Sequence, residues 1–204
     1  MITLHALKFS RATRVLWLLE DLGQPCKRID YERTAEFRAP ETLSKVHPLG
    51  KSPVIEDDGM MLSESATILR YLVAKYSDHS HQPTHGTPAF WRHESLLDYV
   101  ESTFAGVAMQ SIMPAFQHKD VPKQAKSALD KHLDFITAEL GEGPLLLGAN
   151  LTLADIQISY ILALLDRFGL LSDHPGVAAF WQALLFQPGY IAATKAAGPM
   201  APPE

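Results

Sequence analysis

Residues His47 to Ile68, with the sequence HPLGKSPVIEDDGMMLSESATI, decide the fold of the first third of the chain. An apolar run that begins at Pro53 and a second run, Met60-Met61-Leu62, flank an Asp-Asp-Gly turn, which predicts a β-hairpin. Ser63 is predicted to cap the helix that follows, because the next apolar residues recur on one helical face. Those apolar residues are Ile68, Leu69, Leu72 and Val73.

The residues before this hairpin predict a β-α-β-α order. Residues 2–7 and 26–31 are predicted strands, and apolar residues at helical spacing between them predict a helix that Gly23 stops. Residues 41–46 predict a short helix, which ends at the His47–Gly50 turn. The fold class is therefore α/β for an N-terminal domain over residues 1–77, followed by a linker at 78–88 and an all-helical domain over 89–204.

Local patterns in the second domain support the helical prediction. Leu97, Val100 and Phe104 follow a helical period. Thr152 and Asp155 predict a capping box, with Asp in the place of the usual Glu. The helix that they start is apolar nearly all round, so we expect it in the middle of the domain. The tail from Gly198 is expected to be loosely held.

Composition excludes several classes of function. The 204 residues carry a net charge of −5, with 47% hydrophobic and 20% charged residues, typical of a folded soluble chain. An acidic chain without a Lys/Arg block is a poor nucleic-acid ligand. No basic leader precedes an apolar run, and no apolar stretch reaches the ~20 residues that span a membrane. We expect a cytoplasmic protein without nucleic-acid or membrane partners.

Ser10 lies where the first strand ends and a helix begins. Unpaired amides and a partial positive charge at a helix N-terminus stabilise an anion. Taken alone, Ser10 is better explained as an N-cap, a common role for serine. If Ser10 is catalytic, it acts by donating a hydrogen bond to an anion at the helix end.

Two further segments carry polar groups at element starts. Ser52 precedes Pro53, so its backbone is biased to an extended form that can pair with an extended ligand, beside Lys51. At the next helix start, Ser65 suits a carboxylate and Glu64 an ammonium group. Taken alone, the Lys51-Ser52-Pro53 segment is better explained as an ordinary exposed turn, and the Glu64-Ser65 segment gives only a weak signal beyond an ordinary helix cap.

Taken together, these segments resemble the glutathione transferases. The matching stretches are Ser10–Glu20, His47–Ile55, Leu62–Ile68 and Thr152–Asp155, and the resemblance covers about residues 1–190. It implies a thioredoxin-like first domain followed by an all-helical domain, a cis peptide at Pro53, and a serine-type, bacterial-like member. It also implies a symmetric homodimer that acts in detoxification.

The resemblance also implies a role for each site residue. Ser10 is the catalytic residue that bonds the glutathione sulfur, and the Ser52 backbone, next to Pro53, pairs with the cysteinyl unit. The γ-glutamyl and glycyl ends are assigned to three residues, namely Glu64 and Ser65 for the first and Lys51 for the second. The sequence departs from the family at two places: His5 stands where several classes keep a tyrosine, and no cysteine lies near Ser10.

One serine is enough for this chemistry on energetic grounds. Lowering a thiol pKa of about 8.5 by two units requires about 2.7 kcal/mol. A hydrogen bond to a charged group contributes about 1.5–3 kcal/mol, and a helix N-terminus about 0.3–1. A solvated arginine is the expected state of Arg11 and Arg14.

Three function classes remain open at this point. The first is conjugation of the glutathione thiolate to small, hydrophobic electrophiles, with glutathione as co-substrate and no cofactor. The second is peroxide reduction or isomerisation that uses glutathione at the same site, and the third is a noncatalytic binding module. His79, His81 and His85 lie in the predicted linker, so we expect no metal site there.

Overall fold

The computed structural model describes residues 1–203, which form two compact units. Unit 1 comprises Met1–His79 and the C-terminal stretch from Gln187, and unit 2 comprises Ser80–Phe186. We expected all residues from 89 onward to form the helical domain. The structure instead groups the C-terminal stretch with the N-terminal residues.

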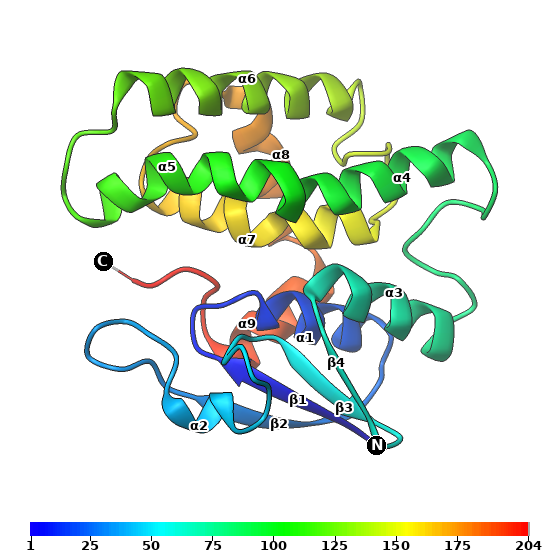
Figure 1. Cartoon of the computed structure of the whole chain (residues 1–204). Helices are drawn as coiled ribbons and strands as arrows, with labels where there is room; N and C mark the ends of the chain where they lie inside the picture. Colours follow the sequence, from blue (N-terminus) through cyan, green and yellow to red (C-terminus); the bar gives the residue numbers. More distant parts are fainter. Residues whose placement is uncertain (204) are drawn as a thin grey trace. The chain divides into compact units, whose positions relative to one another are not determined.

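Unit 1 is built on a mixed sheet. Its strands in the described residues lie in the order β2-β1-β3-β4, with β1 parallel to β2 and antiparallel to β3. Helices α1 and α3 pack on β1 and β3, and α9 packs on α1 (Figure 1). The elements are β1 (Ile2–Leu7), α1 (Ala12–Asp21), β2 (Cys26–Tyr31), α2 (Glu41–Ser44), β3 (Val54–Asp57), β4 (Met60–Ser63), α3 (Ser65–Tyr76) and α9 (Pro188–Ala197).

The elements predicted before residue 77 are present in the predicted order. Gly23 adopts a left-handed φ of 59°, and the Gln24 amide donates to the Leu19 carbonyl at 2.9 Å, so the chain leaves α1 where the sequence indicated. The prediction for Ser63 is wrong. Ser63 pairs with Val54 as the last residue of β4, so the strand includes Ser63 and α3 begins only after Glu64.

The C-terminal helix is fixed to α1 by close packing. The rings of Trp17 and Tyr190 meet edge to face with centroids 5.3 Å apart. Gly189 lies so close to α1 that an added Cβ would overlap Asp21 and lie 2.6 Å from the Trp17 ring. The expectation of a loosely held tail is wrong at Met200, which is only 1% exposed.

Unit 2 consists of helices around one buried helix, α7 (Figure 1). As the sequence predicted, every residue from Leu153 to Leu165 is buried, and the capping box of Thr152 and Asp155 is present. The elements are α4 (Pro88–Tyr99), η1 (Val100–Phe104), α5 (Ala105–Phe116), α6 (Lys123–Leu140), α7 (Leu153–Arg167) and α8 (Pro175–Leu185). Within residues 1–203, no helix is both long and apolar enough to cross a membrane.

Candidate functional site

Ser10 ends the loop between β1 and α1 and is only 6% exposed. Its hydroxyl donates to the Leu7 carbonyl at 2.6 Å and accepts from the Ala12 amide at 3.2 Å. The structure therefore places Ser10 in a capping arrangement at the start of α1. The hydroxyl reaches an anion only if it turns away from the Leu7 carbonyl.

Ser52 connects the end of β1 to the turn before β3. Its hydroxyl accepts from the Leu7 amide at 3.0 Å and donates to the His5 carbonyl at 2.9 Å. The Ser52–Pro53 peptide is cis, as the resemblance implied. Because β1 and β3 begin to pair at His5 and Val54, the Ser52 backbone lies just beyond the ladder, where an extended ligand could continue it.

Lys51 is exposed, and the turn before it requires a glycine. Gly50 has a φ of 55°, and a Cβ there would lie 2.6 Å from the Ser44 hydroxyl. The Gly50 amide also donates to the His47 carbonyl at 2.8 Å, which closes the turn. This turn fixes the position from which the Lys51 side chain projects.

Glu64 and Ser65 form the junction between β4 and α3. Glu64 is exposed and has φ 70° and ψ 112°, a conformation that L-residues adopt only at a cost of about 1–3 kcal/mol. The Ser65 side chain is buried, and its hydroxyl accepts from the Arg14 guanidinium at 3.3 Å. Strain of this kind is typical of functional positions, so it supports a role for Glu64.

The predicted exposure of the Arg14 side chain is wrong. We expected a solvated side chain, but Arg14 is 0% exposed. The bond to Ser65 connects the first turn of α1 to the first turn of α3. Every residue of α1 from Ala12 to Leu19 is buried, and this burial comes from tertiary packing that no local pattern in the sequence indicated.

His5 is held on both ring nitrogens. Nδ1 lies 2.8 Å from the Tyr31 hydroxyl and Nε2 lies 3.1 Å from a Glu56 carboxylate oxygen. Burial raises the pKa of Tyr31, and the Glu56 charge raises it further. His5 thus bonds Tyr31 and Glu56 within the sheet, whereas Ser10 bonds the backbone of Leu7 and Ala12.

The environment of the single cysteine disfavours ionisation of its thiol. Cys26 is half-buried, and burial followed by the Glu20 charge raises its thiol pKa, which disfavours the thiolate that a nucleophile needs. Among residues 1–203, no three His, Cys, Asp or Glu side chains gather as a metal site would require.

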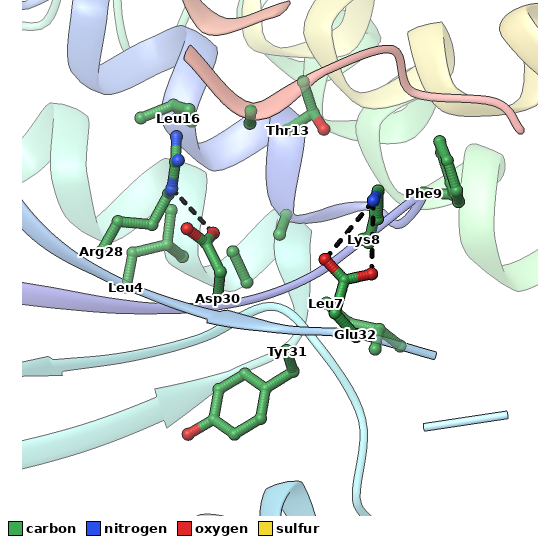
Figure 2. A pocket seen from close by; sticks show the side chains of 13 residues that line it. Leu4, Leu7, Lys8, Phe9, Thr13, Leu16, Arg28, Asp30, Tyr31 and Glu32 are labelled. Carbon is green, nitrogen blue, oxygen red and sulfur yellow. Dashed lines mark hydrogen bonds and ion pairs between the residues drawn. The ribbon is translucent and has the colours of Figure 1, made fainter. Parts of the chain in front are cut away.

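A cavity of about 180 Å³ lies beside the Ser10 loop, between β1, β2, α1 and Ala197 (Figure 2). Two ion pairs line it, Lys8 with Glu32 at 3.3 Å and Arg28 with Asp30 at 2.7 Å. In the part of the chain that the structure describes, its lining includes none of the predicted site residues. Hydrogen bonds instead connect Ser10 and Ser52 through Leu7, and connect Ser65 to Arg14 in α1.

Comparisons with known proteins agree with the geometry of unit 1. The family model "Glutathione S-transferase, N-terminal domain" matches residues 1–74, and "Glutathione S-transferase, C-terminal domain" matches residues 100–188. Glutathione S-transferase 3 of Schizosaccharomyces pombe is 33% identical over 78% of this chain and 72% of its own length. Glutathione S-transferase 1 of Saccharomyces cerevisiae is 31% identical over 97% of this chain and 95% of its own length.

Solved structures show the same fold. A glutathione S-transferase from Actinobacillus pleuropneumoniae superposes with a TM-score of 0.86 at 27% identity, covering 98% of this chain and 94% of that one. A sphingomonad glutathione S-transferase, solved in complex with glutathione, has a TM-score of 0.77 at 22% identity and covers 96% of this chain and 98% of that one.

Proposed function

The chain belongs to the glutathione S-transferase family, and on that premise we propose that it conjugates the glutathione thiolate to small hydrophobic electrophiles, with Ser10 as the residue that bonds the sulfur. One observation carries the proposal. Three polar segments from distant parts of the sequence, at Ser10, Ser52 and Ser65, lie at neighbouring ends of elements within unit 1 and are joined by hydrogen bonds.

Each end of glutathione has a matching group in this arrangement. The Ser52 backbone, next to Pro53, is set to pair with the cysteinyl unit, because it continues the line of β3. The γ-glutamyl carboxylate fits the first amides of α3 and the Ser65 hydroxyl, with the buried Arg14 charge beneath them. Glu64 faces the γ-glutamyl ammonium, and Lys51 faces the glycyl carboxylate.

The observed hydrogen bond of Ser10 lowers the energy available for thiol ionisation. The hydroxyl gives up a bond of ~1 kcal/mol to the Leu7 carbonyl and gains one of about 1.5–3 kcal/mol to a charged sulfur. The start of α1 adds about 0.3–1 kcal/mol. The net of ~2 kcal/mol lowers the bound thiol pKa by roughly 1.4 units, less than the two units that the sequence-based sum allowed.

The reaction then needs little else from unit 1. The bound thiol loses its proton to solvent, and a sulfur lone pair forms the carbon–sulfur bond. The leaving group departs from that carbon, or an acceptor atom in the electrophile takes a proton. The protein supplies the thiolate and its orientation, and the reactivity of the electrophile sets the remaining barrier.

Retention on immobilised glutathione, followed by assays of several electrophile classes beside a peroxide assay, tests the proposal. We expect retention and conjugation of at least one electrophile class. Peroxide reduction without any conjugation would replace the proposed reaction with glutathione-dependent reduction at the same site. Retention without turnover in either assay would indicate a binding module.

We also propose a symmetric homodimer in the cytoplasm, on the strength of the family. Leu96, Tyr99 and Met109 lie off the helix face that carries Leu97, Val100 and Phe104, and form a second apolar strip that a partner subunit could cover. This strip supports the dimer only in part, because Leu96 is 4% exposed, whereas Tyr99 and Met109 are partly exposed. A stable twofold contact buries about 1,200–2,000 Å² or more. Sedimentation at micromolar concentration is expected to give twice the 22.6 kDa chain mass, and an active species at the chain mass excludes the dimer.

A further inference from the structure

Arg33, in the loop after β2, binds the backbone of the β1–α1 loop and of its own loop. Its Nε donates to the Lys8 carbonyl at 2.9 Å, and one Nη donates to the Phe9 carbonyl at 2.7 Å. The other Nη donates to the Phe37 carbonyl at 3.0 Å. Three donors of one guanidinium thus hold three carbonyls, two of which belong to the residues just before Ser10.

The carbonyl partners of Arg33 lie in an unusual backbone. Phe9 and Phe37 have φ values of 53° and 61°, in the left-handed region that bulky side chains rarely adopt. Their rings stack with centroids 6.2 Å apart, and the Arg33 guanidinium lies 4.4 Å from the centre of the Phe37 ring. Such strained conformations persist only where the surrounding structure holds them in place.

We infer that Arg33 is a positioning residue for the thiolate site, an inference that rests on the proposed role of Ser10. In a trans peptide the carbonyl and the N–H point in opposite directions. The Phe9 carbonyl is bound to Arg33, so the Ser10 N–H of the same peptide faces away from Arg33. The Phe9 carbonyl therefore does not point toward the sulfur. Arg33 thereby holds the loop that ends at Ser10 in a conformation that favours the binding of an anion.

The geometry of the guanidinium makes this role specific to arginine. A lysine keeps the positive charge but is a point donor that cannot reach three carbonyls in a fixed fork. Loss of the fork frees the peptide between Phe9 and Ser10 to rotate, which brings a carbonyl dipole toward the thiolate. The binding groups at Glu64 and Ser65 lie in a different segment, where the Ser65 hydroxyl accepts from Arg14.

The test compares Arg33→Lys and Arg33→Gln with Arg38→Lys. Arg38 is an exposed arginine in the same loop, so it controls for the same chemical change without the three carbonyl bonds. Ultraviolet absorbance of the bound thiolate gives its pKa, calorimetry gives glutathione affinity, and the pH profile of kcat/KM gives activity. Thermal unfolding reports the stability of each variant.

For Arg33→Lys we expect the bound thiol pKa to rise by ~1 unit, so that kcat/KM near pH 7 falls about sixfold, in proportion to the thiolate fraction. A tenfold loss of glutathione affinity would require the loss of about 1.4 kcal/mol of binding free energy, which this segment does not contribute. Glutathione affinity is therefore expected to stay within about twofold of the wild-type value. Arg38→Lys is expected to match the wild type. If Arg33→Gln does not fold, Arg33→Lys decides alone.

A wild-type thiol pKa in Arg33→Lys overturns the inference, even if that variant is less stable, because a merely structural role lowers stability alone. The outcome also separates the inference from the proposed function. If the wild-type protein does not lower the thiol pKa at all, the proposed role of Ser10 and that of Arg33 both fail. If Ser10→Ala loses the shift and Arg33→Lys keeps it, only the role of Arg33 fails.

Discussion

The buried guanidinium of Arg14, in the first turn of α1, donates to the hydroxyl of Ser65, the first residue of α3, at 3.3 Å. The bond joins the segment that carries Ser10 to the segment proposed to bind the γ-glutamyl group. A buried charge is costly unless polar groups surround it, so each partner of Arg14 contributes to stability. Ser65 therefore has a structural role as well as a proposed binding role.

Ser65→Ala is expected to lower stability and glutathione affinity together. Removing an acceptor from a buried charged donor costs about 1–3 kcal/mol. Ser63→Ala is the matched control, because Ser63 lies two residues earlier at the end of β4. Urea unfolding and calorimetry check both variants. Full stability in Ser65→Ala would show that Arg14 does not depend on this hydroxyl.

Glu64→Gly is expected to separate stability from binding. Glycine adopts a positive φ without the steric cost that Glu64 bears at φ 70°, although it also loses more entropy on folding. We expect the free energy of unfolding to rise by ~1 kcal/mol while glutathione affinity falls. A variant that is more stable and binds as well as the wild type would remove Glu64 from the site.

Ser10→Ala is expected to raise the bound thiol pKa by ~1 unit, because the hydroxyl contributes about 1.4 kcal/mol net of its bond to Leu7. Glutathione affinity is expected to change little. The same substitution removes the acceptor for the Ala12 amide and lowers stability by ~1 kcal/mol. Thiolate absorbance in the complex is the measurement, with exposed Ser102→Ala in unit 2 as the control. An unchanged pKa with unchanged turnover assigns thiol activation to another group.

The parts of the fold that were predictable from sequence are those with local causes. The hairpin around Gly59, the end of α1 at Gly23 and the Thr152 capping box each depend on a few neighbouring residues. The errors arise where pairing or packing overrides a local signal. Ser63 joins β4 because it pairs with Val54 across the hairpin, and Arg14 is buried by packing that no local pattern reveals.

The same distinction applies to the candidate site. Residue types at element starts indicated where polar groups stand, and a resemblance assigned their roles. The hydrogen bond that Ser10 makes to Leu7 and the three carbonyls held by Arg33 depend on loop conformation. Positive φ values at Phe9 and Glu64, which are not glycines, gave no signal in the sequence.

Asp57, at the end of β3, gives a prediction for acid stability. Its carboxylate accepts hydrogen bonds from three side chains of α3: Tyr71, Lys75 and Tyr76. Burial alone raises the pKa of Asp57, but these hydrogen bonds lower it from 3.8 to about 2. The shift corresponds to ~2.5 kcal/mol.

Because the folded-state pKa of Asp57 is depressed, its contribution is complete above about pH 4 and is lost as the pH falls through about 2. Asp57→Asn is expected to lower the free energy of unfolding by ~2 kcal/mol at neutral pH and to flatten its dependence on pH between about 4 and 2. Asp58→Asn removes an exposed partner of the same Lys75 and is expected to change stability by less than about 1 kcal/mol. Equal effects of the two variants in urea unfolding would contradict this assignment.

Gly189→Ala tests whether the C-terminal helix belongs with unit 1. The added Cβ would overlap the Asp21 carboxylate and lie 2.6 Å from the Trp17 ring, so α9 must move away from α1. Overpacking of this kind costs about 1–3 kcal/mol, and movement of α9 also exposes the Trp17–Tyr190 contact. We expect a lower unfolding midpoint and faster proteolysis of the C-terminal stretch from Gln187, measured by mass spectrometry of the fragments.

Gly198→Ala, in the open turn after α9, is the control for loss of a C-terminal glycine, because no atom lies within 4 Å of the position of its added Cβ. Since Gly198 has a φ of 82°, this control is expected to lose some stability through strain yet to retain the protease resistance of α9. Equal protection of α9 in Gly189→Ala and the wild type would show that α9 does not require close approach to α1.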